Sequence, residues 1–173
     1  MEIIIEFGKL LIPALLVLYA MYLTVKNVLN KEIANKEIDL KIKNYETILP
    51  LRLQAYERLT LLLERISPNN IMVRLNNPRY TAKEFQILLV KEIRDEFNHN
   101  LSQQIYVGEE SWALVNKAIE DTISLINQAE SSIKEDAKAM DLTKAVFAEI
   151  LQNETDSISH ALSQLKKEVG QFY

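Results

Sequence analysis

The N-terminal part of the chain is almost continuously apolar. Residues 10–25 read "LLIPALLVLYAMYLTV" without a charged side chain, and three isoleucines and Phe7 come before them. A helix over residues 3–25 would be about 35 Å long at 1.5 Å per residue, enough to cross a hydrocarbon core of about 30 Å. The pattern predicts a transmembrane helix within residues 1–26, with these positions along its span: Ile3, Leu10, Leu15, Leu18, Tyr22 and Val25.

The lysines around this segment predict its orientation. Five lysines follow the apolar run within residues 26–43, whereas only Lys9 precedes it. Because positive charge favours the cytoplasmic side, we expect the N-terminus outside and everything after the span in the cytoplasm. The start "ME" and the exit "MYLTVKN" lack the basic start and small-residue exit of a cleaved signal peptide, so we expect the segment to stay attached.

Residues 27–49 contain no glycine or proline and interleave charged residues with single apolar ones. At 100° per residue, the apolar positions fall on two nearly opposite helix faces. One face holds Val25, Leu29, Ile33 and Leu40, and the other holds Ile38, Ile42, Tyr45 and Leu49. We expect a helical stalk whose contacts change sides near residues 36–42, where a packed domain begins.

Prolines, glycines and capping residues divide the rest of the chain. Pro50 is expected to begin a second helix that "SPNN" at 67–70 ends, because the missing N–H of proline is harmless in a first turn. Thr81 and Glu84 form a capping box that predicts another helix start. Gly108 is expected to end that helix in a left-handed conformation. The apolar positions of the helix recur every fourth residue: Phe85, Leu89, Ile93, Phe97, Leu101 and Ile105.

Two further helices are predicted after Gly108. The acidic residues of "EES" at 109–111 begin the first, where they interact favourably with the helix dipole. Asp141 is expected to cap a last helix that reaches Phe172. From Ile158 onward the apolar residues of this helix are spaced 4, 3, 4 and 3 apart, as in a coiled coil.

These elements predict an all-α protein, since no segment alternates apolar and polar residues long enough to predict a strand. The expected architecture is an N-terminal transmembrane helix that continues into a stalk, followed by an up-down helical bundle with coiled-coil-like packing. We place the transmembrane anchor at residues 1–26, the helical stalk at 27–49 and the cytoplasmic bundle domain at 50–173.

Composition excludes several classes of function. The chain has no cysteine, which excludes disulfides, thiolate metal sites and cysteine nucleophiles. Its three glycines are too far apart for the glycine-rich turns that bind dinucleotides or phosphates. Residues 108–173 hold six Lys or Arg against twelve Asp or Glu, a balance that would repel phosphate backbones. We therefore expect no nucleic-acid partner, no cofactor and no small-molecule substrate.

Glu96 and His99 show the Glu-x-x-His spacing found in carboxylate-bridged metal sites. Glu92 lies on the same strip of the predicted helix, but this strip is opposite Phe97 and Leu101 and therefore faces away from the core. An alternative is a metal-binding helical-bundle enzyme that uses these three residues with Asp156 and His160. A second Glu-x-x-His motif is absent, so we expect a polar surface and no catalytic or metal-binding residue.

The stretch "EFNHNLSQQIYVGEESW" at 96–112 is interpreted as a corner between two helices, with apolar residues on both sides of Gly108. A tryptophan at a helix start can pack over the preceding corner or anchor a partner. The amides of the stretch have no role inside the predicted bundle. We therefore expect contact with another chain at these positions: Asn98, Asn100, Gln103, Gln104 and Trp112.

The order of features resembles a family of small single-span proteins from Bacteroidetes-type bacteria whose function is unknown. The resemblance covers most of the chain and is carried mainly by "EFNHNLSQQIYV" running into "EESW". It implies a protein of the bacterial inner membrane and supplies no catalytic residue.

The sequence thus predicts a membrane-anchored helical interaction or scaffold module, a non-catalytic subunit or adaptor of a larger membrane protein complex. Its expected partners are the lipid bilayer and either other membrane-complex proteins or further copies of itself. The alternatives are the metal-binding enzyme and a stalk that relays a signal through the change of helix face at Ile38.

Overall fold

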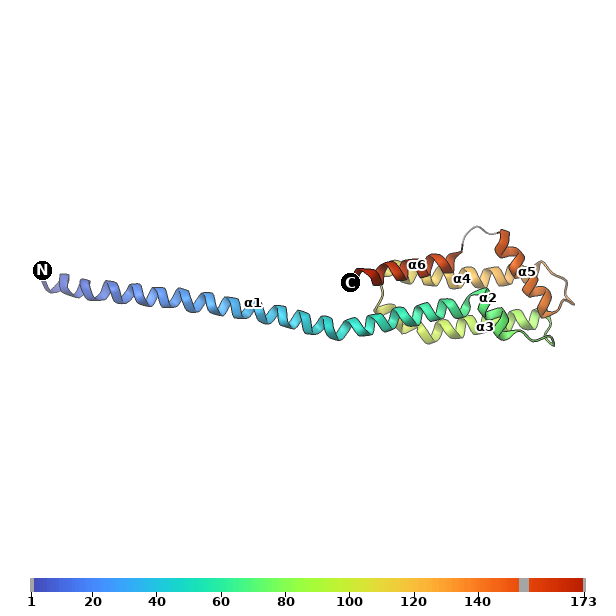
Figure 1. Ribbon diagram of the computed structural model, residues 1–173, viewed down its shortest axis with the longest axis horizontal. Helices are drawn as coiled ribbons and strands as arrows, with labels where there is room; N and C mark the ends of the chain where they lie inside the picture. The colour runs from blue at the N-terminus through green and yellow to red at the C-terminus, as the bar shows by residue number, and fades with distance from the viewer. Residues whose placement is uncertain (1, 153–155, 173) are drawn as a thin grey trace. The chain divides into compact units, whose positions relative to one another are not determined.

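The computed structural model describes the backbone of residues 2–152 and 156–172, and among these the side chains of residue 11 and of residues from 15 onward. The described backbone is all-α, as predicted, with one isolated bridge between Thr81 and Lys138. The described residues form six α-helices (Figure 1): α1 (Glu2–Ile66), α2 (Pro68–Leu75), α3 (Ala82–Asn100), α4 (Glu109–Ser131), α5 (Ala139–Gln152) and α6 (Ser157–Val169). Two 3₁₀ turns, η1 (Leu101–Ile105) and η2 (Gly170–Phe172), follow α3 and α6.

The chain divides into two compact units, Met1–Leu49 and Pro50–Tyr173. The first unit is the N-terminal part of α1, and its side chains are exposed from Leu15 to Ile48. Of the positions expected along a membrane span, Ile3 and Leu10 fall outside the residues whose side chains are described. Leu15, Leu18, Tyr22 and Val25 are exposed.

Across the described part of the chain, no helix is both long enough and apolar enough to cross a membrane.

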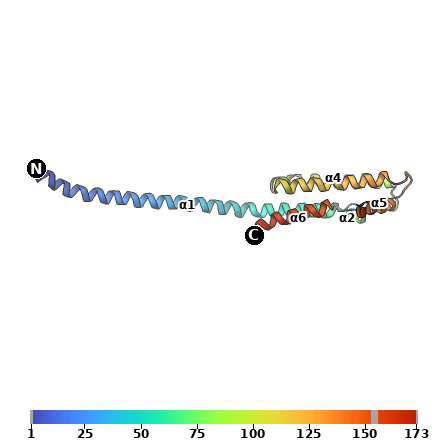
Figure 2. The ribbon, with the colours of Figure 1, turned by 90° about the horizontal axis from the view of Figure 1, so that it is seen from above.

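The second unit is a bundle of four long helical segments. Residues 50–66 of α1 run antiparallel to α3, α4 runs antiparallel to α3, and α6 returns beside α4 (Figure 1). Figure 2 shows α6 and this part of α1 in one layer and α4 in the other. The short helices α2 and α5 pack together at the end of the bundle near Ile66, which we call the Ile66 end; the opposite end is the Pro50 end.

The core of the bundle consists mainly of aliphatic side chains, together with Phe85, Tyr56 and Met72. Each buried side chain of this size stabilises the fold by roughly 1.5–3 kcal/mol relative to exposure. The largest fully buried residues come from five of the six helices: Leu59, Leu62, Leu63, Ile66, Ile71, Met72, Phe85, Leu89, Ile93, Ile119, Ile126 and Leu142. Leu165 and Ile158 bring α6 into the same cluster.

Two predicted helix boundaries are wrong. Pro50 does not begin a helix, because α1 continues through it. Proline has no N–H, so Pro50 cannot donate the helical hydrogen bond to the carbonyl oxygen of Glu46. Both residues are exposed, so water can hydrate this oxygen instead. The region predicted as one last helix forms two helices, α5 and α6. The cap of α6 is Asp156 rather than Asp141, and its side chain accepts a hydrogen bond from the Ser159 N–H at 3.1 Å.

The helix after Thr81 begins as predicted, with both hydrogen bonds of the capping box present, but α3 ends at Asn100 rather than at Gly108. Residues spaced four apart advance about 40° beyond a full turn at each step, so such a stripe drifts around the helix. Phe85, Leu89 and Ile93 are buried accordingly, whereas Leu101 and Ile105 are exposed.

Candidate functional site

The outer surface of α3 carries a row of exposed residues that the core does not use. We call this row the outer face of α3; it consists of Ile87, Lys91, Arg94 and Asn98 on α3 and of Leu101 and Ile105 on the adjoining turn η1. The four α3 residues are spaced 4, 3 and 4 apart and therefore lie on one side of that helix. The row is apolar at both ends and polar with two positive charges in the middle. Ile105, at the η1 end, is 74% exposed.

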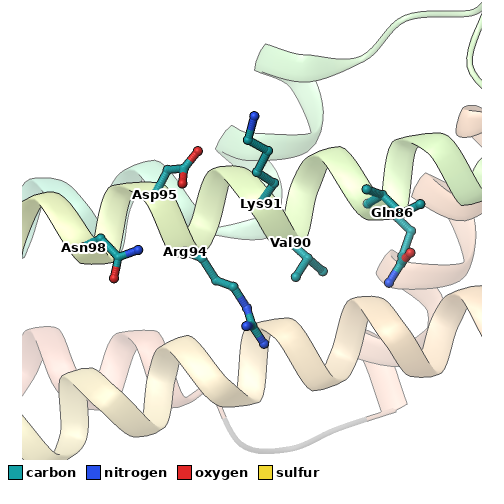
Figure 3. A pocket seen from close by; sticks show the side chains of 7 residues that line it. Gln86, Val90, Lys91, Arg94, Asp95 and Asn98 are labelled. Atoms are coloured by element: carbon teal, nitrogen blue, oxygen red, sulfur yellow. The ribbon is translucent and has the colours of Figure 1, made fainter.

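A shallow depression of about 440 Å³ lies along the middle of this face. In Figure 3, Gln86, Val90 and Arg94 point toward α4, while Lys91 and Asp95 point to the other side of α3. The Gln86 amide is held by a hydrogen bond from Nε2 to Oδ1 of Asn127 at 2.6 Å. Neither Lys91 nor Arg94 forms a salt bridge with another described residue, so both charges face solvent or a partner.

The predicted contact residues are distributed around the α3–α4 corner. Asn98 and Gln104 are exposed and Gln103 is partly exposed. Asn100 is buried, and its Nδ2 donates to the Glu96 carbonyl oxygen at 2.9 Å. This amide is therefore bonded inside the bundle and is not available to contact another chain. Trp112 is half-buried and stacks on Phe97 with ring centroids 5.7 Å apart, which places it over the corner.

The corner is closed by hydrogen bonds to one carboxylate, that of Glu168 on α6. The Gly108 N–H donates to Glu168 Oε1 at 2.7 Å, and the Ser111 hydroxyl donates to Oε2. Arg52 lies 3.7 Å from the same Oε1 and also donates from Nε to the Tyr106 carbonyl oxygen at 2.9 Å. Three elements, α1, the corner and α6, are therefore tied together at the Pro50 end.

The electrostatics of this cluster favour a charged glutamate and a neutral tyrosine. Burial raises the pKa of Glu168, but hydrogen bonds from Ser111, Tyr56 and the Gly108 N–H, together with the charge of Arg52, bring it below its usual value. Burial, followed by the hydrogen bond to Glu168, raises the pKa of Tyr56 to about 12. Because the Gly108 N–H, the Ser111 hydroxyl and the Arg52 guanidinium all bond to other groups of the protein, we interpret the cluster as a structural lock.

Phe172 completes the lock from the C-terminal turn η2. The Arg52 guanidinium lies 4.4 Å from the centroid of its ring, within the range of a cation–π interaction. The Tyr56 ring meets the same phenylalanine edge-to-face, with centroids 5.8 Å apart. Sequence reasoning missed this cluster because Arg52, Ser111 and Glu168 lie in three distant segments, and none belongs to a recognisable motif.

The residues of the alternative metal site are engaged in other interactions. Arg74 pairs with Glu92 at 2.6 Å, Arg65 pairs with Glu96 at 3.0 Å, and His99 Nδ1 contacts the Asp95 carbonyl oxygen at 2.7 Å. The carboxylate of Asp156 caps α6, which lowers the pKa of Asp156 through the Ser159 hydrogen bond despite an opposing effect of burial. Among the described residues, no three His, Asp or Glu side chains are grouped so that they could hold a metal ion.

The chain matches, over residues 2–172, the family described as "Family of unknown function (DUF7935)". It belongs to that family. No curated protein and no solved structure matches the chain. The expectation of a family of unknown function is therefore confirmed.

In this DUF7935 chain the Ile66 end also carries a cavity, of about 720 Å³, between the α1–α2 corner, α4 and the start of α6. Its carboxylates come from Glu64, Asp121 and Asp156, and Lys117 pairs with Asp121 at 2.8 Å. Ser67 and Asn70 donate to the Glu64 carbonyl oxygen, which ends α1. Ser67, Asn70, Asp156 and Ser159 in this cavity are used to end or cap helices. The outer face of α3 differs from it in combining exposed apolar side chains with basic ones.

Proposed function

We propose that the chain is a membrane-anchored helical interaction module, a non-catalytic subunit or adaptor of a larger membrane protein complex, whose partner binds the outer face of α3. The observation that carries the proposal is the row on α3, because it combines exposed apolar residues with two positive charges. Hydrophobic anchors with a central basic pair are suited to an amphipathic helix that bears acidic residues between apolar ones.

The membrane part of the proposal rests on the sequence. Residues 10–25 contain no charged side chain, and lysines follow this run far more often than they precede it. We infer a bacterial inner-membrane anchor within residues 1–26, with the N-terminus outside and the bundle in the cytoplasm. This arrangement would tether the bundle to the membrane, where other membrane subunits are available.

The bundle is suited to this role because its stability does not depend on the proposed surface. Ile87 and Ile105 are exposed, while the core beneath them is completed by Leu89, Ile93 and their neighbours. Substitutions on the outer face should therefore change binding without unfolding the domain.

The test is a pull-down of the full-length chain from membranes in mild detergent, comparing two matched variants. Ile105→Asp places a charge on the outer face, and Val73→Asp places one at a site on α2 that is equally exposed, 79% against 74%. We expect Ile105→Asp to lose its partner and Val73→Asp to retain it. The assignment of the surface is wrong if both variants retain the partner or both lose it.

A further inference from the structure

The stalk carries an apolar seam that is separate from the outer face of α3. Ile38, Ile42 and Tyr45 are each about half exposed, at 55%, 50% and 52%, although they are large and apolar. Together with Leu49 they are spaced 4, 3 and 4 apart along α1. This is the spacing at which two helices pack side by side in a coiled coil.

The heptad positions are fixed by this spacing. Ile42 and Leu49 occupy a positions, and Ile38 and Tyr45 occupy d positions. The same register places Asn35 at the preceding a position. A single asparagine at an a position favours a defined register between two strands, at some cost in stability. We call the five residues Asn35, Ile38, Ile42, Tyr45 and Leu49 the stalk seam.

The charged residues beside the stalk seam indicate which helix can pair with it and whether the two helices run parallel or antiparallel. The e positions are all acidic, Glu32, Asp39 and Glu46, and Lys41 is the charged residue at g. In a parallel, in-register pair, a g residue lies beside the e residue of the following heptad of the other strand. Lys41 would then face Glu46 of the partner subunit, once on each side of the seam.

An antiparallel pair would instead bring the e positions of the two strands together. Carboxylates would face carboxylates along the whole seam, which is unfavourable. A second copy of the chain therefore fits the stalk seam in one direction only.

We propose that residues 35–49 of α1 form a parallel, in-register, two-stranded coiled coil with a second copy of this chain. This inference is independent of the proposed partner surface on α3, because it rests on other residues and another helix. The two copies would present two outer faces, so that one assembly would offer its partner two equivalent sites.

The absence of cysteine from the chain allows a direct test by disulfide cross-linking. Asn35→Cys and Ile42→Cys place a thiol at two a positions, where the same residue of both strands meets in a parallel pair. Thr47→Cys places it at an f position on the outside of the pair. We expect mild oxidation of the full-length chain in detergent micelles to give covalent dimers for the two a-position variants and not for Thr47→Cys.

Each other result overturns the proposal. Failure of both a-position variants to cross-link would show that the seam is not shared with a second copy. Cross-linking of only one of them would indicate an antiparallel or shifted pair. Equal cross-linking of Thr47→Cys would show random collision.

A charge-exchange series tests the predicted contact between Lys41 and Glu46 of the partner subunit. Lys41→Glu should raise the dimer dissociation constant by about tenfold, since it converts two attractive pairs into repulsive ones. The double variant Lys41→Glu with Glu46→Lys should restore dimerisation, and Lys43→Glu, at a b position, should leave it unchanged. Sedimentation equilibrium in density-matched detergent measures all three. A double variant as weak as Lys41→Glu alone would refute the pairing.

Discussion

The backbone N–H of Gly108 donates a hydrogen bond of 2.7 Å to Oε1 of Glu168, sixty residues later in the chain. Gly108 has φ −69° and ψ 154°, an extended conformation, and it caps the start of α4. The prediction that this glycine is left-handed at the end of a helix is therefore wrong. The need for glycine has another cause, because a Cβ at this position would lie 2.7 Å from the same Glu168 oxygen.

This contact predicts that Gly108→Val lowers the free energy of unfolding by about 1–3 kcal/mol. A carboxylate on a flexible side chain could normally move aside, but Glu168 is held by Ser111 and Arg52 as well as by the glycine itself. Gly170→Ala is the matched control, because a Cβ there meets no atom within 4 Å. Chemical denaturation of both variants measures the difference, and equal stability would contradict the close contact.

Glu168→Gln tests the electrostatic part of the lock. The folded state lowers the pKa of Glu168, so its carboxylate stabilises the fold above the usual pKa of 4.5, and this contribution is lost as the pH falls through the lower, folded value. We expect the variant to lose about 1–3 kcal/mol at pH 7 and to lose less further stability than the wild type below pH 4.5.

The control for this prediction is Glu120→Gln, an exposed glutamate on α4. It should match the wild type at neutral pH and in acid. Urea denaturation at pH 7 and at several values below 4.5 gives both comparisons. If Glu168→Gln keeps the acid sensitivity of the wild type unchanged, Glu168 is not the group responsible.

The contrast between the two ends of α3 shows what the sequence could predict. Thr81 and Glu84 are three residues apart and satisfy each other's hydrogen bonds, so the start of α3 follows from local chemistry. The start of α4 at Glu109 follows in the same way from acidic residues after a glycine. Both helix starts can therefore be predicted from residues that are neighbours in the sequence.

The lock at the Pro50 end could not be predicted in this way. Arg52 and Glu168 are brought together only when α1 and α6 pack in the bundle, and neither residue is distinguished by its neighbours in sequence. Of the residues on the outer face of α3, the sequence singles out only Asn98 as a partner contact. The four-residue spacing places Leu101 and Ile105 in the core, but they are exposed because such a stripe drifts around the helix.

His99→Ala distinguishes a polar surface from a metal site. His99 is exposed, and its ring nitrogen Nδ1 contacts the carbonyl oxygen of Asp95 one turn earlier, so we expect the substitution to change the free energy of unfolding by no more than about 0.5 kcal/mol. A chelator should leave the melting temperature of the wild type unchanged. Thermal melts of both proteins, with and without chelator, test this. A melting temperature that falls with chelator in the wild type but not in His99→Ala would restore the metal alternative.

The orientation of the proposed anchor predicts the result of proteolysis on whole cells or spheroplasts. If the lysines after the apolar run keep the following segment inside, residues 27–173 should resist a protease added outside. The same protease should degrade the stalk once the membrane is permeabilised, which serves as the control for cleavage. Immunoblotting of a C-terminal tag measures both. Cleavage of residues 27–173 in intact cells would reverse the orientation and place the outer face of α3 on the opposite side of the membrane, so the partner would have to be sought there.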